Sequence, residues 1–322
     1  MIITDKDFAT NIPIILKNEK IWVIGLSGGA DSLCLTLLAN KYCIENNIEL
    51  IACFVDHKLR PESSIEIIPI INILNEKNIK YKVLVWHHDE IIEHNIEKKA
   101  RDARYKLLYD FCKEIGSNVL LTAHHALDQW ETFFMRISKG SSLKGLSCIQ
   151  PISLKHDIIL ARPLLSFLPD DIKETLAKTF KILDFVKDPS NEDAKYERVR
   201  WRKAYSVLSN QYKLDAQNIN KTVKRIQSAN NCLNELADKF INENFIENHI
   251  IINKYKELPD ELKIRILNRI ITKIQRKEII SYSLLERVSN NICQKEFIAT
   301  NIAGLILKKD RTKNIKIYRE TR

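Results

Sequence analysis

Residues 21–39 read IWVIGLSGGADSLCLTLLA, and this stretch decides the fold. A short β-branched run, 21–26, is joined to an apolar helical pattern by two adjacent glycines. Such a loop folds tightly, so its backbone N–H groups converge at the N-terminus of the helix with no side chain in the way. The hydroxyls of Ser27 and Ser32 add two more donors. The stretch therefore predicts a strand, a phosphate-binding loop and a helix.

Asp31 is the unusual member of this loop. A carboxylate inside an anion site repels the ligand unless a cation lies between them. We therefore expect Asp31 to bind a Mg²⁺ ion that also binds the phosphates. The alternative is that Asp31 only caps the helix. The loop has neither the Gly-Lys-[Ser/Thr] of a P-loop NTPase nor the G-x-G-x-x-G of a dinucleotide fold, which excludes both classes.

The pattern of strand and helix repeats through the first 135 residues. Nearly continuous apolar runs, each followed by an amphipathic stretch, are typical of a parallel sheet with helices on both faces. The predicted strands are 21–26, 50–55, 81–86 and 118–122, and the predicted helices lie near 31–46, 62–77, 95–115 and 127–138. Ligands of such open α/β sheets bind beyond the carboxyl ends of the strands, so the residues that follow each strand are the candidates for function.

Length and composition exclude several classes of protein. A chain of 322 residues with 45% hydrophobic residues, 7 Gly and 8 Pro predicts about two globular domains rather than a disordered or fibrous protein. It has no apolar run long enough for a membrane span and begins without a secretion signal, so we expect a cytoplasmic protein. Seven cysteines without a Cys-x-x-Cys pair argue against a disulfide framework, a zinc ribbon or an iron–sulfur ligand set.

The excess of positive over negative charge lies entirely in the last third of the chain. Residues 1–200 carry 27 Lys and Arg against 28 Asp and Glu, whereas residues 201–322 carry 24 against 13. Such an excess favours a polyanionic partner, RNA or DNA, although solvated helix faces in a Lys-rich composition would give the same count. Beyond residue 210 the pattern predicts helices near 215–245, 259–275 and 281–292 with short strands near 297–308 and 314–318. We therefore place a domain boundary near residue 210.

The segments after the strands resemble one family. Residues 27–32 (SGGADS) resemble the PP-loop of the ATP pyrophosphatase superfamily. Residues 55–60 (VDHKLR), 95–105 (NIEKKARDARY) and 122–132 (TAHHALDQWET) are similar to V-D-H-x-L-R, N-x-E-x-x-A-R-x-x-R-Y and T-A-H-H-x-D-D-Q-x-E-T of the tRNA(Ile)-lysidine synthases. Further matches are 140–146, 162–165, 188–191, Arg198, Arg200 and Arg202. The resemblance covers about residues 20–205, and the basic C-terminal part agrees only in size and charge.

This resemblance implies an adenine-nucleotide alpha-hydrolase-like α/β fold and a tRNA-modifying ligase. In that family, ATP adenylates O2 of the wobble cytidine in an isoleucine tRNA with a CAU anticodon. The amine of free lysine then attacks C2, AMP leaves, and the lysidine so formed reads AUA. The expected ligands are therefore ATP, Mg²⁺, L-lysine and tRNA(Ile), without a membrane or an obligate protein partner. Residues 1–210 would be the catalytic PP-loop domain and residues 211–322 a basic tRNA-binding domain.

The resemblance also assigns the site residues. ATP binding falls to Ser27, Gly28, Gly29, Ala30, Asp31, Ser32, Asp56, His57 and Arg101. Catalysis falls to Asp31, His124, Arg200 and Arg202, with Asp31 also the metal ligand. Lysine binding falls to Asp128 and Glu131, three apart on one helix face, where two carboxylates attract a compact cation.

Alternatives remain open for several of these residues. Asp128 and Glu131 would also suit a solvated helix face. Since successive side chains of a strand alternate, only one of His124 and His125 is expected to face the site, and we favour His124. The arginines near residue 200 would either neutralise the α-phosphate or contact the tRNA backbone. His57 and Arg60 would otherwise only order their loop.

Leu127 is the departure that matters most, because the family has the first acid of an Asp-Asp pair at this position. The other departures are Lys139, Ser142, Val199 and Trp201. A PP-loop thiolase is disfavoured because its cysteine pairs are missing, and an amidotransferase because no segment is left for a glutaminase domain. A nucleotide-gated RNA-binding protein without catalytic activity is favoured by Leu127 alone.

Overall fold

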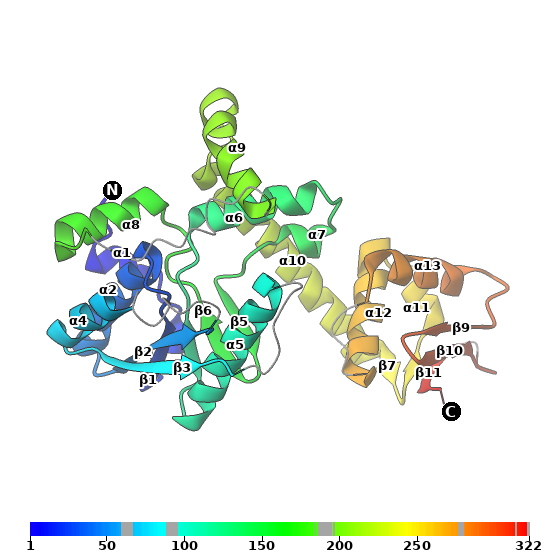
Figure 1. Ribbon diagram of the computed structural model, residues 1–322. Helices are drawn as coiled ribbons and strands as arrows, with labels where there is room; N and C mark the ends of the chain where they lie inside the picture. Colours follow the sequence, from blue (N-terminus) through cyan, green and yellow to red (C-terminus); the bar gives the residue numbers. More distant parts are fainter. Residues whose placement is uncertain are drawn as a thin grey trace. The chain divides into compact units, whose positions relative to one another are not determined.

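The computed structural model describes residues 1–58, 67–87, 96–183, 185, 195, 197–275, 280–312 and 314–320 (Figure 1). The chain forms two compact units. The first consists of residues 1–141 and 145–224, and the second of residues 142–144 and 225–322. No described helix is long and apolar enough to cross a membrane.

The first unit is built on a six-stranded sheet in the order β3-β2-β1-β4-β6-β5. Its strands are β1 (Ile21–Gly25), β2 (Glu49–Asp56), β3 (Lys80–Val85), β4 (Val119–Leu121), β5 (Ile152–Lys155) and β6 (Ile158–Ala161). All neighbouring strands are parallel except β5, which runs antiparallel to β6 at one edge. The predicted parallel sheet is confirmed, and the hairpin of β5 and β6 is an addition that the sequence pattern did not predict.

Helices cover both faces of this sheet because alternate strand residues point to opposite sides. On β1, Trp22 and Ile24 belong to one buried core, whereas Val23 belongs to another. The first core is closed by α1 (Asp5–Thr10), η1 (Ile14–Leu16), α2 (Ala30–Glu45), α4 (Ile68–Glu76), α8 (Pro169–Thr175) and the π-helix η2 (Leu176–Phe180). The second is closed by α5 (Ile96–Glu114).

An aromatic cluster fastens two further helices of the first unit to each other. Trp130 on α6 (Ala126–Ile137) lies against Phe134 of the same helix and against Trp201 and Tyr205 of α9 (Glu197–Tyr212), with ring centroids 4.4 to 6.3 Å apart. The Trp130 indole N–H also donates to the Leu214 carbonyl at 2.6 Å. The short helix α7 (Leu143–Leu146) follows α6 in the chain.

The second unit is a small α+β module, as the sequence predicts. Its helices are the later part of α10 (Ala216–Asn244), α11 (Ile252–Lys256), α12 (Asp260–Gln275) and α13 (Tyr282–Cys293). Its antiparallel sheet, in the order β7-β8-β11-β10-β9, contains β7 (Phe245–Ile246), β8 (His249–Ile250), β9 (Ala299–Ile302), β10 (Leu305–Lys309) and β11 (Ile315–Arg319). The predicted strand 297–308 is a hairpin that turns at Ala303 and Gly304, both with positive φ.

The predicted boundary at residue 210 falls inside α9, and the two units meet in sequence at residues 224 and 225. The assignment of ATP binding to residues 1–210 and of tRNA binding to residues 211–322 stays a prediction.

The cysteines are free thiols. Four of them, Cys34, Cys43, Cys53 and Cys112, are buried among apolar side chains of the first unit, and burial raises the pKa of each to about 12. Cys232 on α10 is exposed. The buried four therefore act as small apolar residues, as their neighbours in the sequence suggest.

Candidate active site

The candidate site lies where the strand order of the first sheet reverses. The chain leaves β1 through α2 toward β2 on one side, and it returns from β3 through α5 to β4 on the other side. The carboxyl ends of β1 and β4 therefore flank a topological switch point, the place where open α/β sheets bind their ligands. Residues 26–29 follow β1, and residues 122–125 follow β4.

The loop after β1 is held closed by the hydroxyl of Ser32. The backbone N–H of Ser27 donates to the Ser32 Oγ at 3.1 Å, and that hydroxyl lies 3.1 Å from the Gly29 carbonyl, to which it donates. Gly28 has φ of 84°, a conformation that favours glycine. Gly29 is the N-cap of α2, so the turn ends where the helix dipole is positive. The loop has the form of an anion cradle.

Asp31 and His125 bring the two loops of the switch point together. Asp31 is in the first turn of α2 with its side chain 40% exposed, and its Oδ2 lies 3.7 Å from the His125 Nε2. The Nδ1 atom of His125 accepts the backbone N–H of Asp128 at 3.3 Å. With Nδ1 as an acceptor, a neutral His125 carries its proton on Nε2, facing Asp31. Burial raises the pKa of Asp31, against the opposing effect of His125.

His125 is fixed in place because it is the N-cap of α6. Its backbone N–H donates to the Asp128 carboxylate at 3.0 Å, which completes a reciprocal capping box with the bond to Nδ1. A residue that caps a helix and is followed three positions later by Asp is a local pattern that the sequence contains. Asp128 stands three positions after His125, and this spacing distinguishes His125 from His124.

His124 occupies a different environment. Its Nδ1 lies 3.1 Å from the Thr122 hydroxyl, and burial lowers its pKa to about 3, with Arg162 and Arg101 acting in the same direction and Asp128 against it. The imidazole is therefore neutral at physiological pH. His125 is the histidine that lies beside Asp31, and the catalytic role of His124 stays a prediction.

The low pKa of His124 predicts an acid-labile first unit. A histidine with a folded pKa below its unfolded value of about 6.5 adds stability above pH 6.5 and loses it as the pH falls toward 3. Between pH 7 and pH 5.5 we expect a loss of roughly 1 kcal/mol in the free energy of unfolding. Urea unfolding followed by tryptophan fluorescence measures it, since all four tryptophans belong to the first unit. His124→Gln should flatten this pH dependence, and an unchanged dependence would contradict the assignment.

Glu131 is buried and Asp128 is mostly covered, so the alternative of a solvated helix face does not hold. The Asp128 side chain is 14% exposed and that of Glu131 is 0% exposed. Burial alone would raise the pKa of Asp128, but His125, His124 and Arg198 hold it below its usual value. Burial keeps the pKa of Glu131 above its usual value in spite of its arginine partners.

The arginines of α9 divide into two groups. Arg198 and Arg202, four residues apart on one helix face, direct their Nε atoms to the Glu131 carboxylate at 3.4 and 2.7 Å. Arg200 is exposed and donates to the Lys195 carbonyl at 2.8 Å. The structure therefore unites Arg202 with the proposed lysine-binding acids and places Arg200 apart from them. The proposed catalytic role of Arg200 stays a prediction.

The remaining predicted ATP-binding residues lie at two other strand ends and on α5. The Asp56 carboxylate at the end of β2 accepts the Lys58 N–H and pairs with the Lys58 ammonium, both at 2.9 Å. The His57 ring meets the Trp86 ring edge to face at 5.8 Å. Arg101 is exposed and lies over the Tyr105 ring at 5.2 Å. Arg60 and the segment 188–191 lie outside the described residues.

Leu127 is buried in the first turn of α6, beside Asp128. The next residue, Gln129, exchanges two hydrogen bonds with the backbone of Ile149, at 2.9 and 2.8 Å. The first turn of α6 is thus fixed by a backbone clamp as well as by the capping box.

No group of three or more His, Cys, Asp or Glu side chains in the described part of the chain is arranged to hold a metal ion. A site for Mg²⁺ does not require one, because this ion usually binds through one or two carboxylates together with substrate phosphates and water. Asp31 stands beside the anion cradle, and its burial disfavours an uncompensated negative charge. These features fit a single protein ligand for a phosphate-bound cation.

The chain matches the PP-loop domain family over residues 4–208. It is 33% identical to the tRNA(Ile)-lysidine synthase of Wolbachia pipientis wMel over 92% of this chain and 70% of that protein. It is 32% identical to the Rickettsia prowazekii (strain Madrid E) protein of the same name, over 97% of this chain and 73% of that protein. The tRNA(Ile)-lysidine synthase of Rickettsia bellii (strain OSU 85-389) is 28% identical over 92% of this chain and 69% of that protein.

Among solved structures, the U34-tRNA thiolase NcsA from Methanococcus maripaludis has a similar fold. The TM-score is 0.59 at 22% identity, over 69% of this chain and 77% of that one. At this identity the likeness concerns the fold alone.

Proposed function

This chain belongs to the tRNA(Ile)-lysidine synthase family and carries its PP-loop domain, and from this membership we propose the reaction that it catalyses. ATP adenylates O2 of the wobble cytidine in an isoleucine tRNA with a CAU anticodon, and pyrophosphate leaves. The amine of free lysine then attacks C2, and the C2–O2 bond breaks to release AMP and leave lysidine. These substrates are those of the cytoplasm, where we expect the reaction.

The observation that carries this proposal is the meeting of the anion cradle with the capping box at the switch point. The cradle presents the N-terminus of α2 to the phosphates. Asp31 at its edge lies beside His125, and His125 is in turn joined to Asp128 by the capping box. Ser27 to Ser32 would hold the phosphates. From the match to the family motifs, we propose that Asp56, His57 and Arg101 bind the rest of the nucleotide.

Asp31 would hold the Mg²⁺ ion at the edge of the cradle. When bound, this ion neutralises negative charge that develops on the phosphates. The His125 imidazole lies beside this carboxylate, with Nε2 3.7 Å from Oδ2, and the capping box fixes the imidazole. The carboxylates of Glu131, Asp128 and Asp31 all attract the Arg202 guanidinium electrostatically. Arg202 therefore supplies positive charge to this side of the site. His124 and Arg200 remain proposed catalytic residues from the family pattern.

Asp128 is the better placed of the two acids to attract the lysine side chain. Its pKa is held low, so it is ionised at neutral pH, and it keeps some exposure. Glu131 already has two guanidinium partners and no exposed surface. We propose that Asp128 binds the ammonium directly and that Glu131 contributes through Arg202.

Substitution of Asp128 tests this assignment. We expect Asp128→Asn to raise the KM for lysine about tenfold, the effect of losing a charge-assisted contact, and to change the KM for ATP much less. Glu131→Gln should act in the same direction. Steady-state kinetics with lysine and ATP varied separately measures both. Equal effects on the two substrates would mean that the acids have a structural or metal-binding role instead.

The second unit, which carries most of the net positive charge, is proposed to bind tRNA. Phosphate contacts supply much of the affinity of proteins for structured RNA, and the first two hundred residues have almost no net charge. The lysine-incorporation assay tests the whole proposal. The protein is incubated with a CAU-anticodon tRNA(Ile) transcript, ATP and radiolabelled lysine, and label in acid-precipitable RNA is counted. Folded protein that binds ATP and tRNA but incorporates no lysine would favour a nucleotide-gated RNA-binding protein.

A further inference from the structure

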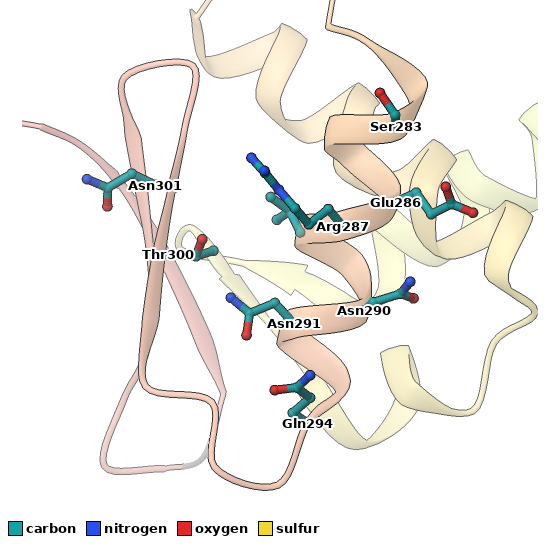
Figure 2. Close-up of a pocket in the computed structure, with 9 residues that line it drawn as sticks. Ser283, Glu286, Arg287, Asn290, Asn291, Gln294, Thr300 and Asn301 are labelled. Carbon is teal, nitrogen blue, oxygen red and sulfur yellow. The ribbon is translucent and has the colours of Figure 1, made fainter.

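The sheet of the second unit has one covered face and one open face. Leu305 and Leu307 of β10 and Ile315 and Ile317 of β11 point into the core that α12 and α13 close. Because strand side chains alternate, the residues between them point to the other side. Figure 2 shows the same alternation on β9, where Thr300 lies toward α13 and Asn301 points away from it.

The open face carries basic side chains at its centre. Lys308 of β10 and Lys316 of β11 are both exposed and lie directly opposite each other in the register of the two strands. Lys309 and Arg311 follow in the same hairpin. Within the described residues, none of these four side chains takes part in an ion pair. Like charges that face each other across strands destabilise a sheet, so this arrangement costs stability unless an anion binds.

The one acid of this hairpin does not neutralise the lysines. The Asp310 carboxylate accepts the hydroxyl and N–H of Thr312 and the N–H of Asn314, at 2.7 to 3.0 Å, and its other oxygen lies 3.3 Å from the His249 Nε2. These hydrogen bonds, first that from the Thr312 hydroxyl, lower the pKa of Asp310. Asp310 therefore shapes the turn, and the lysines keep their charge for another partner.

An aromatic ring completes the surface. Tyr318 is 37% exposed, lies two residues after Lys316 on the same face, and pairs with Ile306 across the hairpin. Tyr318 and the four basic side chains, with Asp310, line a hollow of about 560 Å³. An exposed aromatic beside lysines on an open sheet face is an arrangement with which proteins stack an unpaired base and hold its phosphates.

We propose that this open face, defined by Lys308, Lys316 and Tyr318 and flanked by Lys309 and Arg311 at the end of the hairpin, binds an unpaired stretch of the tRNA substrate. An unpaired base stacks on Tyr318, and the adjacent phosphates lie against Lys308 and Lys316 and so relieve their mutual repulsion. The identity of the RNA rests on the proposed function, whereas the choice of an RNA rests on the charge and the exposed ring.

Binding of a CAU-anticodon tRNA(Ile) transcript to the full chain tests the surface. The double variant Lys308→Gln/Lys316→Gln should bind about tenfold more weakly and lower the slope of log K against log salt by about 1 to 2, since two phosphate contacts are lost. Tyr318→Ala should bind about tenfold more weakly, and Tyr318→Phe, which keeps the ring, should stay within about twofold of the wild type. Thermal unfolding should show the double lysine variant to be at least as stable as the wild type.

The matched control is Lys254→Gln/Lys273→Gln, which removes the same charge from two exposed lysines on α11 and α12. Its affinity and salt slope should stay close to those of the wild type. An open-face lysine variant that behaves like this control, or a Tyr318→Phe variant as weak as Tyr318→Ala, would overturn the proposal. Lysine incorporation by the wild type is scored separately: without it the proposed function fails, while the binding comparison still decides for or against the surface.

Discussion

Replacement of Asp31 by Ala should lower AMP release in the presence of tRNA and lysine about a thousandfold. Without this carboxylate the proposed Mg²⁺ ion would lose its protein anchor, and a loss of that size corresponds to about 4 kcal/mol of transition-state stabilisation. Initial rates of AMP formation at saturating Mg²⁺ and ATP provide the measurement. Activity within about tenfold of the wild type would show that Asp31 is only a helix-capping residue.

Asp31→Asn is the matched control for the fold. Burial raises the pKa of Asp31, which means that the folded protein disfavours its charge at neutral pH. A carboxyl whose pKa is raised in the folded protein stabilises the fold at low pH, and this stabilisation is lost as the pH rises through that pKa. The asparagine variant should therefore unfold at the same temperature as the wild type or higher while it also loses activity. A lower unfolding temperature would indicate that the carboxylate supports the fold.

Replacement of Arg202 by Ala should destabilise the first unit by about 2 kcal/mol. Among the described residues, it leaves the fully buried Glu131 with one arginine partner, Arg198, at 3.4 Å. Removal of one partner from a buried ion pair costs about 3 to 5 kcal/mol, and we expect less because Arg202 is itself 38% exposed and screened by water. Urea unfolding followed by tryptophan fluorescence reports this loss directly, since Trp130 and Trp201 lie on the two helices involved.

Arg200→Ala is the control on the same helix and should change the free energy of unfolding by less than about 0.5 kcal/mol, as is usual for exposed residues. The double variant Arg202→Ala/Glu131→Gln should recover part of the loss, because a neutral amide needs no buried counter-charge. If Arg200→Ala and Arg202→Ala are equally destabilising, the ion pair has no special weight.

The sequence was sufficient for the sheet and the loop because both are encoded locally. The apolar runs gave β1 to β4 within about two residues, and two adjacent glycines before a helix gave the anion cradle. The β5–β6 hairpin was missed for an equally local reason. It turns through His156 and Asp157, both with positive φ, where tight hairpins usually use Asn-Gly or Asp-Gly, so no turn signal marks it.

The alternation of side chains along a strand could not decide which of the two histidines faces the site. The alternation of side chains holds within a strand, but β4 ends at Leu121, before either histidine. A capping box sets the direction of His125, and this depends on α6 rather than on β4. The ion pair of Glu131 with Arg202 could not be predicted from the sequence either, because Arg202 lies 71 residues away in the chain and no periodic pattern spans that distance.

The buried thiols of the first unit give this protein a selective chemical handle. A thiol with a pKa of about 12 has a thiolate fraction at pH 7.5 roughly three thousand times lower than that of an ordinary cysteine near 8.5, and alkylating reagents attack the thiolate. Cys232 on α10 is exposed. A maleimide fluorophore should therefore attach to Cys232 in the second unit and leave Cys34 and Cys112 of the first unit unmodified, so that the proposed binding of tRNA can be followed optically in the native chain.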